Sequence, residues 1–134
     1  MKKKVRFFLV IMAMCILTSS MTAFAETKTF SFSMKKGESD TGTWTAVKAD
    51  SEQTAYVTPT SITGKGTIYA AVYNKKGTTQ YTVDIAISNG EANMKKTADY
   101  YITGKAGTTY SLCAGDDEGM VTSTTFKASG RWTP

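Results

Sequence analysis

Apolar and polar side chains alternate along much of this chain, and a period of two is typical of β-strands with one buried face. In residues 80–88, for example, Tyr81, Val83, Ile85 and Ile87 are separated by single polar or small residues. No window has the i, i+3, i+4, i+7 spacing of an amphipathic helix. The alternation predicts strands over residues 27–34, 43–49, 54–58, 67–74, 80–88, 98–103, 108–114 and 121–129.

The connections between these runs are short, which favours an antiparallel sandwich or barrel. Asn74-Lys75-Lys76-Gly77 separates two alternating runs, and Gly77 in the left-handed region would close a hairpin there. We therefore predict an all-β fold, a single antiparallel β-sandwich of about seven or eight strands. Its core is expected to include Phe30, Phe32, Ile68, Val72, Val83, Ile85, Ile87, Leu112 and Phe126.

Residues 1–25 differ from the rest of the chain. Four cations within residues 1–6 precede an apolar run over residues 7–17, and the segment ends in Ala23-Phe24-Ala25. This order is that of an N-terminal secretory signal peptide, so we expect cleavage after Ala25 and export of residues 26–134 as one extracellular domain. A retained membrane anchor is the alternative, but the apolar run is about half of the ~20 residues that a spanning helix needs. No second apolar run of that length follows, so we expect no transmembrane segment in the mature chain.

Removal of this segment changes the charge of the protein. The full chain carries 16 Lys and Arg against 11 Asp and Glu, and four of the cations lie in residues 1–6, so the net charge falls from +5 to +1. A nearly neutral domain does not favour nucleic acid as a partner.

The chemistry available to residues 26–134 is limited. The chain has no histidine, and Cys113 is the only cysteine after residue 25. These absences exclude Ser-His-Asp, Cys-His and His-bearing zinc sites, so an enzyme would depend on carboxylates, lysine or tyrosine. We predict a protein that is not an enzyme and has no cofactor. Cys113 is expected to be either a buried thiol or part of an intermolecular bridge.

One acidic cluster, Asp116-Asp117-Glu118, lies between two glycines. Converging carboxylates could bind Ca²⁺, although the spacing fits no known calcium loop. A solvated hairpin tip is the favoured explanation, and the prediction is that there is no metal site.

The candidate ligand-binding residues are aromatic. Tyr69, Tyr73 and Tyr101 alternate out of phase with the expected core, and Trp44 is one of two tryptophans. A row of exposed rings could stack on sugar rings, as extracellular β-domains often do. Burial between the sheets or pairing across strands is the structural alternative.

Lysine doublets recur at residues 35–36, 75–76 and 95–96. Gathered at one end of a sandwich, they would form a basic rim attracted to an anionic surface. Solubility and protection of sheet edges explain them otherwise.

The C-terminal third contains Tyr100-Tyr101-Ile102 and ends in the stretch from Thr125 to Pro134, with the pattern S-G-x-W-x-P. In this it resembles short secreted proteins of Gram-positive Firmicutes. The resemblance implies an extracellular β-domain and brings no activity or site residues.

These observations predict a small secreted binding or surface-associated module, with an extracellular glycan or cell-wall polymer as its possible partner. A bacteriocin-like secreted effector and a carboxylate-based hydrolase are the alternatives.

Overall fold

The computed structural model describes residues 26–116 and 118–134, so the predicted signal peptide lies outside the described residues. The described part contains eight strands and no helix. Several bounds differ by a few residues from the predicted runs. The strands are β1 (Lys28–Met34), β2 (Ser39–Val47), β3 (Thr54–Thr63), β4 (Thr67–Asn74), β5 (Ile85–Ser88), β6 (Lys96–Asp99), β7 (Thr109–Gly115) and β8 (Phe126–Thr133).

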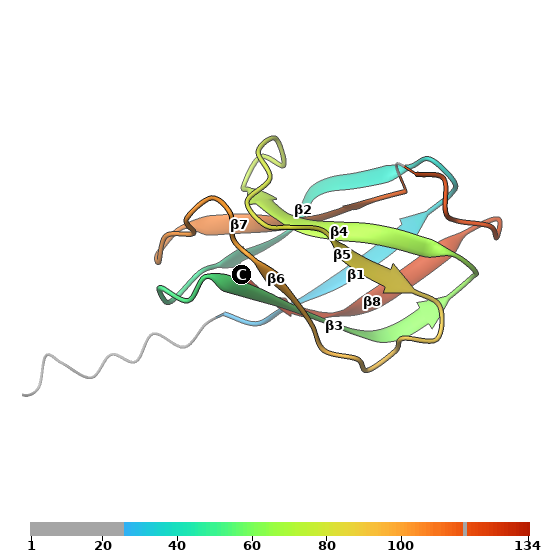
Figure 1. The fold of residues 1–134 in the computed structure, drawn as a ribbon, viewed down its shortest axis with the longest axis horizontal. Coiled ribbons are helices and arrows are strands. Elements are labelled where there is room, and N and C mark those ends of the chain that lie inside the picture. The colour runs from blue at the N-terminus through green and yellow to red at the C-terminus, as the bar shows by residue number, and fades with distance from the viewer. Residues whose placement is uncertain (1–25, 117) are drawn as a thin grey trace, which may run out of the picture.

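The strands form two four-stranded antiparallel sheets, which confirms the predicted β-sandwich. One sheet has the order β1-β8-β3-β6 and the other has the order β2-β7-β4-β5. Figure 1 shows them as two layers, with β2 and β4 in one and β3 and β8 in the other. The first strand pairs with the eighth, the second with the seventh, the third with the sixth and the fourth with the fifth. This nested pairing is the topology of a jelly roll.

The hydrophobic core lies between the two sheets, where alternate residues of each strand point inward. Eight of the nine predicted core residues are buried there, and Val83 is the exception. Cys113 is also buried, as the thiol interpretation predicts, but it lies outside this core on the outer face of its sheet. The core also holds Met34, Ala46, Val57, Tyr110, Ala128 and Trp132.

The prediction for Val83 was wrong because the alternation changes phase within residues 80–88. Val83 is 50% exposed, whereas the preceding Thr82 is fully buried. The Thr82 hydroxyl accepts a hydrogen bond from the Val72 amide at 3.0 Å, in the place of a strand carbonyl. With Thr82 turned inward, Val83 faces solvent, and the regular strand begins only at Ile85.

The predicted hairpin between β4 and the following run is confirmed. Gly77 has a φ of 72°, and its amide donates to the Asn74 carbonyl at 2.8 Å. The Asn74 carboxamide oxygen also accepts the Thr78 amide at 2.9 Å, so this side chain holds the loop closed. The residues that follow the turn return along β4 through a bridge between Tyr73 and Gln80.

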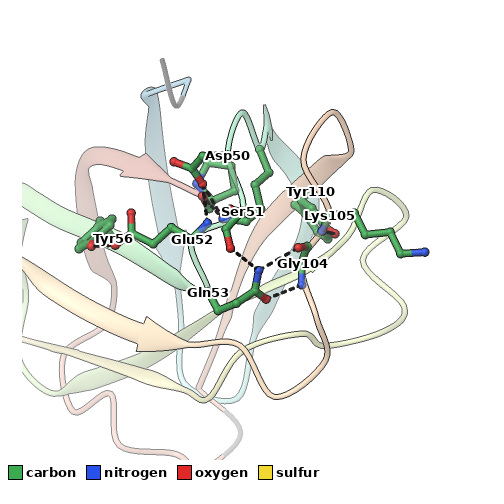
Figure 2. Close-up of polar contacts among 10 residues, drawn as sticks. Asp50, Ser51, Glu52, Gln53, Tyr56, Gly104, Lys105 and Tyr110 are labelled. Carbon is green, nitrogen blue, oxygen red and sulfur yellow. Dashed lines mark hydrogen bonds and ion pairs between the residues drawn. The ribbon is translucent and has the colours of Figure 1, made fainter. Parts of the chain in front are cut away.

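One end of the sandwich is closed around the fully buried side chain of Lys48. Its ammonium donates to the Pro134 carbonyl at 3.2 Å, pairs with Asp50 at 3.3 Å and lies 5.0 Å from the centre of the Tyr100 ring. Gln53 joins the loop after Lys48 to the loop before β7, as Figure 2 shows. Its carboxamide donates to the Gly104 carbonyl at 3.0 Å and accepts from the Gly104 amide at 2.8 Å.

The other end is closed around Asp116, which follows β7 and is also fully buried. Its carboxylate accepts three backbone amides, from Gly37 at 3.0 Å, Met120 at 2.5 Å and Val121 at 3.1 Å. Asp116 thereby connects the β1–β2 turn to the segment that precedes β8.

The lysine doublets do not gather at one end. The doublet at residues 35–36 lies in the β1–β2 turn beside the Asp116 end, whereas the doublet at residues 75–76 lies at the opposite end of β4. The turns of an antiparallel sandwich alternate between its two ends, so the doublets form no basic rim at one end.

Candidate functional site

The outer face of the β2-β7-β4-β5 sheet carries a cavity of about 260 Å³. Along β4, Tyr69, Ala71 and Tyr73 point to this face, since Ile68, Ala70 and Val72 point into the core. The large, small, large sequence leaves a depression over Ala71 between the two rings. We call this cavity the tyrosine groove; it is lined by Ser39, Thr41, Tyr69, Ala71, Tyr73, Gly77, Gln80, Asp84, Cys113, Ala114 and Gly115.

Small residues form the floor of the tyrosine groove. Ala71 of β4 pairs with Cys113 of β7, and Tyr69 pairs with Gly115. Ala71 and Cys113 are both buried although they belong to the outer face. Because Gly115 stands opposite Tyr69 and has no side chain, the strand β7 does not cover the Tyr69 ring.

A polar side-chain network fixes one wall of the groove. The Tyr73 hydroxyl donates to the Gln80 carboxamide oxygen at 2.9 Å. The Gln80 amide nitrogen donates in turn to Asp84 Oδ1 at 2.8 Å and to the Thr82 carbonyl at 2.7 Å. Gln80 thus positions a phenol ring and a carboxylate along the same cavity, which is the kind of preorganisation that lowers the entropic cost of binding.

The loop between β4 and Gln80 closes one end of the groove. Gly77 lines the cavity, and the Lys75 carbonyl accepts a hydrogen bond from the Ser111 hydroxyl at 3.0 Å. The loop is therefore anchored to the outer face of β7, and it stands out from the upper layer in Figure 1.

The structure brings together two of the four predicted aromatic residues. Tyr69 and Tyr73 line the groove, but Trp44 lies on the inner side of β2. Its ring packs edge-to-face against Phe32, with the two ring centres 6.5 Å apart. Tyr101 is 59% exposed and lies outside the cavity. Its hydroxyl donates to the backbone carbonyl of Gln80 at 3.0 Å, so it touches the far side of the groove wall.

The expectation of a solvated hairpin tip is wrong for Asp116, which is fully buried. Both oxygens of Asp116 accept backbone amides, Glu118 is exposed, and residue 117 lies outside the described residues. Among the described residues, no group of three His, Cys, Asp or Glu side chains is placed to hold a metal ion.

Gln80 and Asp84 are site residues that the sequence reasoning missed. The alternation places Asp84 on the polar face of its run, where it is exposed, but no local pattern indicates that Gln80 and Asp84 meet Tyr73. The alternation of Tyr69, Ala71 and Tyr73 was the available signal, since a small residue between two aromatic residues on an outer face predicts a depression.

Comparisons with known proteins add no relative: no protein-family model, curated protein or solved structure matches this chain. A search of residues 26–116 and 118–134 for a helix long and apolar enough to span a membrane finds none.

Proposed function

We propose that this protein is a small secreted, non-enzymatic binding module whose tyrosine groove holds a neutral extracellular polysaccharide. The observation that supports this most directly is the pair of tyrosines, Tyr69 and Tyr73, on one cavity of about 260 Å³. Tyrosine offers a flat apolar ring surface together with a hydroxyl, which suits the apolar faces and polar edges of sugar rings. Secretion is supported by the composition of residues 1–25.

The polar residues of the groove support the same ligand. Asp84 and Gln80 offer carboxylate and amide groups, and Ser39 and Thr41 add hydroxyls on the opposite side of the floor. Sugar hydroxyls donate and accept hydrogen bonds, so a mixed set of donors and acceptors around an open floor matches them better than it matches an apolar ligand.

A binding role is favoured over hydrolysis by the number of acids. Asp84 is the single carboxylate among the described residues of the groove. Glycoside hydrolysis by the usual route needs two carboxylates that face each other across the scissile bond. No feature of the described residues favours a bacteriocin-like effector.

Binding to polysaccharides tests the proposal. The purified protein is run in affinity gels that contain dextran, galactomannan or a soluble β-glucan, and binding to the retaining polymer is then measured by calorimetry. We expect Tyr69→Ala or Tyr73→Ala to weaken binding about tenfold, a loss of roughly 1.4 kcal/mol. Met94→Ala is the control and is expected to bind normally, because this exposed apolar side chain does not line the groove.

Two results would overturn the proposal. One is a wild-type protein that binds none of these polymers. The other is a Tyr69→Ala/Tyr73→Ala double variant that keeps wild-type affinity while its thermal melt confirms that it is folded. The non-enzymatic part fails if prolonged incubation with the retained polymer produces new reducing ends.

A further inference from the structure

The outer face of the other sheet, β1-β8-β3-β6, is built from hydroxyl-bearing and cationic side chains. β8 lies between β1 and β3, so each outward residue of β8 has a neighbour on both sides. The cross-strand rows are Thr29-Arg131-Thr58, Ser31-Ser129-Ser61 and Ser33-Lys127-Thr63. Together with Tyr56 and Lys95, we call these residues the cationic face.

Two cations of this face, Arg131 and Lys127, have no evident role in folding. The direct cross-strand neighbours of Arg131 and Lys127 are all hydroxyl residues, so no carboxylate stands opposite either charge. The ion pairs in the described part of the chain belong to three other lysines, Lys28, Lys48 and Lys96. Protection of an exposed sheet edge does not explain Arg131 and Lys127 either, because β8 is a central strand.

A cavity of about 260 Å³ lies at one end of the face. Lys95, Arg131 and Tyr56 line it with Thr27, Thr58, Trp132 and Thr133, and none of these described lining residues is acidic. The Lys95 ammonium lies 3.9 Å from the centre of the Tyr56 ring, a cation–π contact that holds it over the cavity.

Three acidic side chains, Glu52, Asp50 and Asp99, act on Tyr56 at the border of the cationic face. Glu52 accepts a hydrogen bond from the Tyr56 hydroxyl, which fixes the ring (Figure 2) and raises the pKa of that phenol. Asp99 accepts from the Thr54 hydroxyl at 3.1 Å. The border therefore orients Tyr56, and Lys95 and Arg131 are the charged side chains that line the cavity.

We propose that the cationic face binds an anionic polysaccharide, with its phosphate or carboxylate groups held by Lys95, Arg131 and Lys127. The proposal is independent of the tyrosine groove, which lies on the opposite side of the sandwich. Arginine binds phosphate and carboxylate through two parallel N–H groups, and lysine acts as a mobile point charge.

The spacing of the charges suits a polymer. Lys127 and Arg131 are four residues apart on one strand, or about 13 Å at the usual rise of a strand. Between them lies the serine row centred on Ser129. A hydroxylated chain with repeated charges would meet cations at intervals and hydroxyls in between. A net charge of +1 over residues 26–134 gives no general attraction for nucleic acid. Binding of an anionic polymer would therefore depend on the local charges of the cationic face.

The test compares two double variants with the same change of net charge. Lys95→Gln/Arg131→Gln removes two cations from the cationic face, and Lys76→Gln/Lys105→Gln removes two exposed loop lysines. Binding is measured by calorimetry against a polyol-phosphate teichoic acid, a polyuronate and neutral dextran. We expect the first variant to lose at least tenfold in affinity for a charged polymer while the loop variant binds like the wild type. The tighter binder of the two charged polymers, teichoic acid or polyuronate, shows whether the cationic face prefers phosphate or carboxylate.

Salt dependence adds a second readout, since electrostatic contacts weaken as salt rises. Wild-type affinity should fall steeply between low and physiological salt, and the Lys95→Gln/Arg131→Gln variant should show a shallower fall. The proposal is overturned if neither charged polymer binds, or if both double variants lose affinity equally. Stronger binding to vesicles of phosphatidylglycerol or to DNA than to either polymer would also overturn it, because the occupant would then be of another class.

Discussion

The two ends of the sandwich are each closed around one fully buried charged side chain, but the partners of the two charges differ. Asp116 is held by three backbone amides from two separate segments. Lys48 is held by one backbone carbonyl, one carboxylate and the face of one aromatic ring.

The difference lies in what each partner can do when the buried charge is removed. The Val121 amide at the Asp116 end is buried in its turn, so it would remain unsatisfied without the carboxylate. Asp50, by contrast, has a side chain that is 37% exposed and can be hydrated without Lys48. Equal burial therefore predicts unequal costs, because the cost depends on the groups left behind.

The largest effect is expected for Asp116→Ala. Three amides would lose a charged acceptor, so we expect the free energy of unfolding to fall by about 3–5 kcal/mol, as measured by urea denaturation. Asp116→Asn keeps one acceptor oxygen and should lose less. A loss below about 1 kcal/mol for Asp116→Ala would remove the difference between the ends.

Gly104→Ala tests how tightly the Lys48 end is packed. A Cβ at this buried position would lie 2.7 Å from the Tyr100 ring and 3.2 Å from Lys48 Cδ. We expect a loss of about 2 kcal/mol by the same denaturation assay, typical of overpacking. Lys105→Ala, at the exposed next residue, serves as the control, and an equal loss there would argue against a steric cause.

High pH should affect the Lys48 end through Tyr100. Burial, with smaller contributions from Tyr110 and Asp50, raises the pKa of Tyr100 well above its usual range. A group whose pKa is raised by folding stabilises the fold below its unfolded pKa, and this contribution is lost as the pH rises above about 10. Stability should therefore fall with pH in this range, by up to about 1.4 kcal/mol per pH unit.

Tyr100→Phe isolates this contribution. The Tyr100 hydroxyl is buried and finds no hydrogen-bond partner within the described part of the chain, so its removal should cost little at neutral pH. The variant should lose less stability than the wild type between pH 9 and 11. Parallel pH curves for the two proteins would contradict the assignment.

The smallest effect is expected for Lys48→Met. Methionine keeps most of the buried stem and removes the charge, leaving the Pro134 carbonyl without its donor. We expect a loss of about 1 kcal/mol or less, because Asp50 can be hydrated and apolar replacement of a buried charge is often nearly neutral. A loss as large as that of Asp116→Ala would show that both ends depend equally on their charges.

The alternation of side chains was sufficient to predict the fold class, most of the core and the turn at Gly77, since each depends on neighbours in the sequence. The alternation failed at Val83 because the Thr82 hydroxyl, rather than a backbone carbonyl, accepts the Val72 amide. This contact joins two different segments, so the pattern within residues 80–88 could not reveal it. The burial of Lys48 and Asp116 escaped prediction for the same reason: charged residues are assigned to the surface unless their partners are known.

The candidate site was predictable only in part. Tyr69 and Tyr73 followed from their phase in one strand, but their separation from Trp44 depends on the irregular pairing between Asp40 and Trp44 in β2. The cationic face escaped prediction because its rows combine strands that are distant in the sequence. The hydroxyl neighbours of Lys127 and Arg131 can be identified only when β8 is placed between β1 and β3.

The central position of β8 also sets the order in which the protein can fold. This strand is the last in the chain, yet both β1 and β3 pair with it, across nearly the whole length of the domain. Chains dominated by such distant contacts fold slowly, because the chain loses the entropy of closing long loops before the stabilising contacts form. During synthesis the β1-β8-β3-β6 sheet cannot be completed until Phe126–Thr133 has emerged, whereas every strand of the other sheet is available earlier.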